Sequence, residues 1–127
     1  MNYGLSKTVN LTYEQTIEKA TEELKKEGFG ILTTIDVKET IKKKLDKDFD
    51  KYIILGACNP PIAYEALMAE EQIGLLLPCN VIVYERNGEV KISGFNAGLI
   101  SIISENPKLH ELSKIITEKL QKVIHNI

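Results

Sequence analysis

The sequence predicts an α+β domain, a two-layer α/β sandwich in which helices pack on a mixed sheet. Segments with helical periodicity alternate with short β-branched, apolar segments along the chain. Late in the chain, Asn87-Gly88 separates two such apolar segments and gives the strongest hairpin signal. This hairpin counts against the alternative, a purely parallel doubly wound sheet, and no G-x-G-x-x-G turn follows a strand to indicate a dinucleotide site. The expected order is β-α-β-α-β-α-β-β-α.

Local signals define the elements of the first half. Residues 5–9 are an expected edge strand, and Thr12 and Gln15 form a T-x-x-Q capping box that begins a helix. Gly28 suits the left-handed position that ends this helix. Residues 29–35 alternate as a strand does, and Asp36 with Glu39 repeats the capping pattern before a short helix. The apolar positions of this short helix are Val37, Ile41 and Leu45.

The second half continues in the same way. Residues 52–57 form a continuous apolar run typical of a central strand. Asn59 and Pro60 suit the cap and first position of a helix that ends near Gln72. Strands over residues 79–85 and 90–95 then form the hairpin, and Asn106-Pro107 begins the last helix. Its apolar stripe is Leu109, Leu112, Ile116, Leu120, Val123 and Ile127.

Length and charge restrict the class of protein. A chain of 127 residues with no internal repeat or linker is expected to fold as one domain over residues 1–127. Sixteen basic and eighteen acidic residues give a net charge of −2, so no positive field favours nucleic acid or an anionic membrane. No secretory signal is visible in residues 1–10, and no run of about eighteen apolar residues occurs. A cytoplasmic protein with free thiols is expected.

Two Cys-Asn pairs, Cys58-Asn59 and Cys79-Asn80, lie at strand boundaries and are the candidate ligand-binding residues. Cys58 directly precedes a helix start, where the positive end of the helix dipole favours an anion and lowers the pKa of a thiol. A reactive cysteine, or a small-molecule or anionic ligand, would fit there. The alternative is that both cysteines are buried apolar side chains and both asparagines only cap or turn the backbone.

The sequence indicates no metal site and no particular cofactor. It contains neither C-x-x-C nor H-x-x-x-H, and two cysteines supply half of a tetrahedral thiolate site. Both histidines, His110 and His125, fall on the last helix with no nucleophile nearby in sequence.

Three stretches carry a resemblance to a known family. They are residues 27–37 (EGFGILTTIDV), 55–61 (LGACNPP) and 74–81 (GLLLPCNV). Their order and spacing resemble those of the bacterial and archaeal domain of unknown function 302. The resemblance implies a compact α+β domain that forms dimers, and it supplies no substrate, cofactor or catalytic residue.

Three functions remain open. The leading hypothesis is a non-catalytic ligand-binding or regulatory homodimer with its site at the two Cys-Asn turns. The alternatives are a thiol-dependent redox enzyme that uses Cys58 and a purely structural interaction module, so whether the chain is an enzyme stays undecided. Ile115, Ile124 and His125 widen the apolar stripe of the last helix, and we expect this wider stripe to form the dimer contact.

Overall fold

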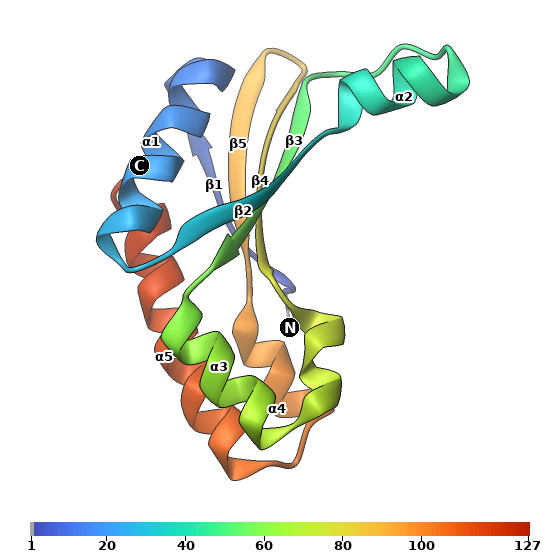
Figure 1. Cartoon of the computed structure of the whole chain (residues 1–127). Coiled ribbons are helices and arrows are strands. Elements are labelled where there is room, and N and C mark those ends of the chain that lie inside the picture. The colour runs from blue at the N-terminus through green and yellow to red at the C-terminus, as the bar shows by residue number, and fades with distance from the viewer. Residues whose placement is uncertain (1) are drawn as a thin grey trace.

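The computed structural model describes residues 2–127, and its main elements follow the predicted order (Figure 1). The strands and long helices are β1 (Gly4–Val9), α1 (Tyr13–Lys26), β2 (Gly30–Asp36), α2 (Val37–Leu45), β3 (Tyr52–Cys58), α3 (Pro60–Ala69), β4 (Cys79–Arg86), β5 (Glu89–Phe95) and α5 (Pro107–His125). Three short elements were not predicted separately: the 3-10 turns η1 (Glu71–Leu76) and η2 (Ala97–Leu99), and the single-turn helix α4 (Ile100–Ile103).

The α+β class is confirmed, but the sheet is antiparallel throughout, so the predicted mixed sheet is wrong. Its strand order is β1-β5-β4-β3-β2, and every neighbouring pair is antiparallel. Parallel neighbours would require a helix that carries the chain back to the start of the adjacent strand. Instead α1 carries the chain from one edge strand, β1, to the other, β2, while α2 and α3 each join strands that pair antiparallel.

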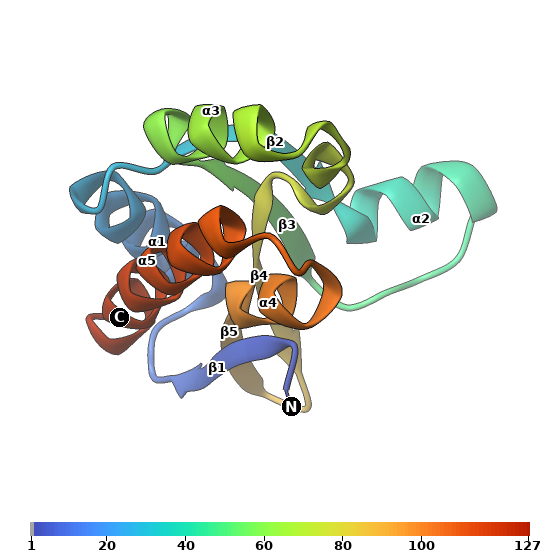
Figure 2. The same cartoon turned by 90° about the horizontal axis from the view of Figure 1, so that it is seen from below.

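Helices cover one face of this sheet. The long helices α1 and α5 pack against β1, β4 and β5, and α3 lies beyond the strand ends beside α5 (Figures 1 and 2). The alternating inward residues of the strands meet the apolar stripes of the helices, as expected for a sheet with one covered face. Fully buried core side chains include Leu24, Leu55, Val81, Val83, Ile92, Leu109, Leu120 and Val123.

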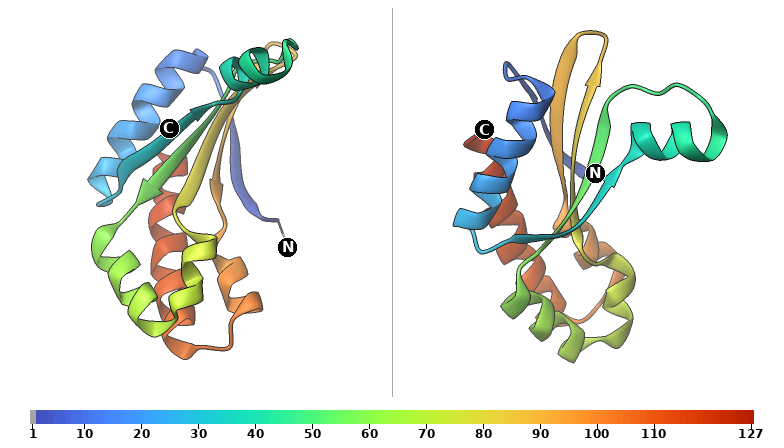
Figure 3. Two further views of the ribbon diagram at one scale, coloured as in Figure 1. Left: turned by 45° about the vertical axis from the view of Figure 1, so that its right-hand side comes forward. Right: turned by 45° about the horizontal axis from the view of Figure 1, so that its top comes forward.

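The helix α2 projects away from this body (Figures 1 and 3). It has the predicted apolar positions, but none of its residues is buried, and Leu45 is 63% exposed. The sheet face opposite α1 and α5 carries half-buried side chains such as Tyr52, Ile82 and Tyr84.

The last helix does not offer the expected dimer patch in full. Ile124 is buried, and it lies over Gly94 of β5 in the same chain, so it is not available to a partner. Ile115 is 37% exposed, and the backbone carbonyl of His125 accepts a hydrogen bond from Lys7 Nζ at 3.2 Å. Within residues 2–127, no helix combines the length and the apolar character needed to cross a bilayer.

Candidate functional site

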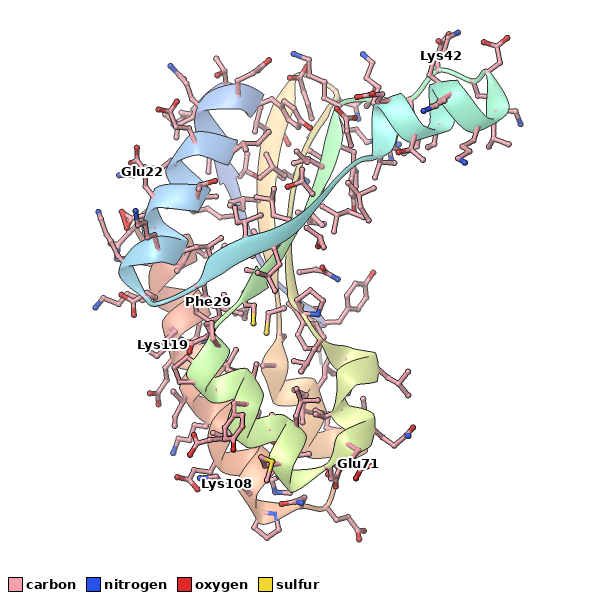
Figure 4. All side chains as sticks on the ribbon, in the orientation of Figure 1. Glu22, Phe29, Lys42, Glu71, Lys108 and Lys119 are labelled. Carbon is pink, nitrogen blue, oxygen red and sulfur yellow. The ribbon has the colours of Figure 1, made fainter. Side chains whose placement is uncertain are left out.

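An apolar pocket of about 290 Å³ lies where β3 leads into α3. Strand β2, the end of β3, helix α3, the start of β4 and helix α5 all contribute to it. Its lining residues are Phe29, Leu32, Thr33, Ala57, Cys58, Asn59, Ile62, Ala63, Leu67, Leu77, Pro78, Cys79 and Ile116. Figure 4 labels Phe29, which lies where β2 begins, above the amino end of α3.

The sheet register brings the two predicted turns together. Cys58 is the last residue of β3 and Cys79 is the first residue of β4, and Ala57 pairs directly with Cys79. Both thiols are free and both line the pocket. Cys58 and Cys79, which are 21 positions apart in sequence, therefore share one site.

Cys79 is the buried member of this thiol pair. Its residue is 4% exposed, and burial raises the pKa of its thiol to about 11, with a further contribution from the neighbouring Cys58. Removal from water disfavours the charged thiolate. At neutral pH Cys79 is therefore a protonated, essentially apolar wall of the pocket, which is the packing role considered from the sequence.

Asn59 lines the pocket, but protein groups satisfy its amide. Its Oδ1 accepts from the Ile62 N–H at 3.5 Å, as predicted for a helix cap, and its Nδ2 donates to the Glu27 carbonyl at 3.3 Å. Gly28 makes the second contact possible, because it has a φ of 85° and a Cβ on it would lie 3.1 Å from Asn59 Nδ2. The side chain thus joins the end of α1 to the start of α3.

Asn80 does not line the pocket. Successive residues of a strand point to opposite faces, and Asn80 follows the buried Cys79 on β4, so its side chain is exposed on the other face. The structure therefore brings together Cys58, Asn59 and Cys79 and leaves the fourth candidate outside.

The first turn of α3, residues 60–63, leaves no free N–H group for an anion. Pro60 and Pro61 have no N–H, the Ile62 N–H donates to Asn59 Oδ1, and the Ala63 N–H donates to the Asn59 carbonyl at 2.9 Å. None of the described residues that line the pocket is charged. The site therefore suits an uncharged ligand better than an anion.

Sequence reasoning missed most of the apolar wall. The β2 contribution depends on an irregularity between Ile31 and Thr33, where the β2–β3 register shifts and Leu32 has no partner. Gly56 accommodates this arrangement, because a Cβ there would lie 2.1 Å from Thr33 Oγ1. A glycine inside an apolar strand run was the one visible signal of such a close approach.

None of the histidines and carboxylates of residues 2–127 is among the residues that line the pocket. Among residues 2–127, no three His, Cys, Asp or Glu side chains gather in a way that would hold a metal ion. The ring of His110 bonds to the Ser104 carbonyl next to α4, away from the pocket lining.

Comparisons with known proteins agree on the family. The model of the family described as "Domain of unknown function DUF302" matches residues 5–127. A solved structure, the crystal structure of an uncharacterized conserved DUF302 protein from Bacillus stearothermophilus, is 31% identical in sequence, with a TM-score of 0.92 over 99% of this chain and 98% of that one. No curated protein matches the chain.

Proposed function

The chain belongs to the DUF302 family, and we propose that this member is a non-catalytic domain that binds a small, uncharged, apolar molecule in the pocket beside α3. The observation that carries this proposal is the pocket lining, in which aliphatic, aromatic, proline and thiol groups surround a single asparagine and a single threonine. Ligand sites are typically concave and predominantly apolar, with few polar groups.

The volume of the pocket limits the size of the ligand. At about 290 Å³ it is near the lower end of ligand sites, and it is roughly twice the 150 Å³ cavity that holds a benzene molecule. A fused or doubly substituted aromatic molecule, or a branched aliphatic one of similar bulk, fits this space.

A neutral fluorescent probe tests the proposal. N-phenyl-1-naphthylamine should bind to the wild-type protein with a rise in fluorescence and a rise in melting temperature, since a ligand that binds only the folded state stabilises it. Ala63→Leu adds volume to the pocket wall and should abolish both effects. Glu65→Leu, an exposed position on the same helix, is the matched control and should bind the probe as the wild type does.

The outcome of this titration separates two of the functions. Equal binding by the Ala63→Leu and Glu65→Leu variants would show that the probe binds elsewhere and would refute the proposed site. No binding by any folded variant would favour the structural interaction module.

A thiol-dependent redox enzyme that uses Cys58 is the second candidate, because Cys58 and Cys79 line the same pocket. The raised pKa of Cys79 argues against a pair of reactive thiolates. Alkylation of each cysteine by iodoacetamide, followed from pH 6 to pH 9, decides the matter. Rapid modification of Cys58 well below pH 8.5 would favour the enzyme, whereas two thiols that react only after unfolding would exclude it.

The proposal also includes assembly and location. We propose a homodimer in the cytoplasm, where free thiols such as Cys58 and Cys79 persist. The uncovered sheet face and the projecting α2 support self-association, since both leave apolar side chains in contact with solvent. Sedimentation at micromolar concentration should give a mass clearly above the 14.3 kDa of one chain.

A further inference from the structure

The helix α2 contacts β2 and β3 of its own chain but buries none of its residues against them. It contains nine residues, none of them buried, and it extends beyond the end of the sheet (Figure 1). Isolated helices shorter than about twelve residues are marginal in water, and most helical stability in proteins comes from packing of an apolar face. Local caps at Asp36 and Asp46 and the ion pairs of Lys42 hold the helix, and its apolar face is left for a second surface to cover.

The exposed surface of α2 combines an apolar stripe with positive charge. We call the projecting helix α2 the arm. Its residues Val37 and Ile41 are half-buried, and Leu45 is exposed at its end. The same nine residues hold four lysines, at positions 38, 42, 43 and 44, and one glutamate. Lys42 forms ion pairs with Asp46 and Asp48 just beyond the helix, so the other three lysines supply the positive charge of this surface. A surface that covers α2 should be apolar at its centre and acidic at its edge.

Such a surface exists at the other end of the molecule. A groove of about 730 Å³ lies between η1 and α4, and its apolar wall includes Leu75, Ile102 and Ile103, each at least 65% exposed. The carboxylates of Glu70 and Glu105 line it, and no lysine or arginine is among the described residues that do so. We call it the η1–α4 groove.

We infer that α2 of one copy lies in the η1–α4 groove of a second copy, and the reverse, across a two-fold axis. Figures 1 and 3 show α2 at the opposite end of the molecule from α4, which borders the groove together with η1, and both ends lie away from α1. A two-fold axis perpendicular to the long dimension places each arm against the partner's groove, and it turns the two uncovered sheet faces toward each other. Apolar side chains then meet apolar side chains, and lysines meet glutamates.

This inference rests on the homodimer proposed above and adds its interface. It also explains why the apolar face of α2 persists without a covering element in its own chain. The proposed interface depends on charge, because each contact pairs the lysines of one copy's arm with the glutamates of the other copy's groove.

A charge-swap experiment tests the arrangement. The arm variant carries Lys43→Glu and Lys44→Glu at exposed positions, and the groove variant carries Glu70→Lys and Glu105→Lys, the two carboxylates that line the groove. Each variant alone opposes like charges in both contacts, so its dimer dissociation constant should rise at least about tenfold. In an equimolar mixture both contacts are complementary, and a heterodimer should form with nearly wild-type affinity and with an affinity that falls at high salt.

Matched controls and contrary outcomes keep the test decisive. Lys25→Glu with Lys114→Glu makes the charge change of the arm variant on the exposed faces of α1 and α5, and it should leave the dimer dissociation constant unchanged. Circular dichroism confirms that each variant is folded. A monomeric wild type would refute the homodimer and this inference together. If the wild type is dimeric but the arm and groove variants each dimerise normally, or do not pair when mixed, only the exchange of arms is refuted.

Discussion

Ionisation of Cys79 should destabilise the protein at alkaline pH. Burial raises its pKa from 9.0 to about 11, so the unfolded chain loses this proton before the folded chain does. The folded state then binds more protons than the unfolded state between pH 9 and pH 11, and the free energy of unfolding falls as pH rises through this interval. Two pKa units at about 1.4 kcal/mol each give a loss of about 2–3 kcal/mol, complete near pH 11.

Urea unfolding at a series of pH values from 7.5 to 11.5, with a reductant present, measures this loss. Burial also raises the pKa of Tyr13 to about 12, so part of the alkaline destabilisation has another source. Cys79→Ala removes only the thiol contribution, and its free energy of unfolding should fall with pH less steeply than that of the wild type by about the stated amount. Parallel pH profiles for the two proteins would refute the assignment of a protonated, buried thiol to the pocket wall.

Two further substitutions test the geometry around the pocket. Gly56→Ala should lower the free energy of unfolding by about 1–3 kcal/mol because its Cβ would meet Thr33 Oγ1. In a double-mutant cycle, Thr33→Ala in the same chain should restore part of that loss, and additive effects of the two substitutions would contradict the close approach. Asn59→Ala should cost about 1 kcal/mol in chemical denaturation through loss of the α3 cap, whereas Asn59→Ser keeps an uncharged acceptor for the Ile62 N–H and loses the bond to Glu27, so it should cost less. An equal loss in both Asn59 variants would assign the effect to the Glu27 contact instead.

The elements that could be predicted from the sequence are those set by neighbouring residues. In the capping box at the start of α1, Thr12 Oγ1 accepts from the Gln15 N–H and Gln15 Oε1 accepts from the Thr12 N–H, each at 3.0 Å. Asn87 and Gly88 have φ values of 54° and 80°, as a two-residue hairpin turn requires. Such bonds and dihedral angles depend on a few adjacent residues, so their pattern is visible in the chain.

The strand order could not be predicted because it depends on contacts between distant segments. Nothing local to β1 shows that it pairs with β5, where Val9 lies opposite Val90. The same limit applies to the site. The pairing of Ala57 with Cys79 brings the two thiols into one pocket, and Ile116 closes it from α5, but each of these contacts joins residues far apart in sequence.

The preference for an uncharged ligand, in contrast, could have been reached from the sequence. An anion at a helix start needs the unpaired N–H groups of the first turn. Pro60 and Pro61 remove two of them, and an asparagine that caps the helix takes the third, which belongs to Ile62. The cap and the anion site predicted around Asn59 therefore exclude each other, since both would use the same N–H group. The residues that identify this helix start in the sequence also leave its first turn without a free donor, so the proposed ligand would depend on the apolar wall around the two thiols.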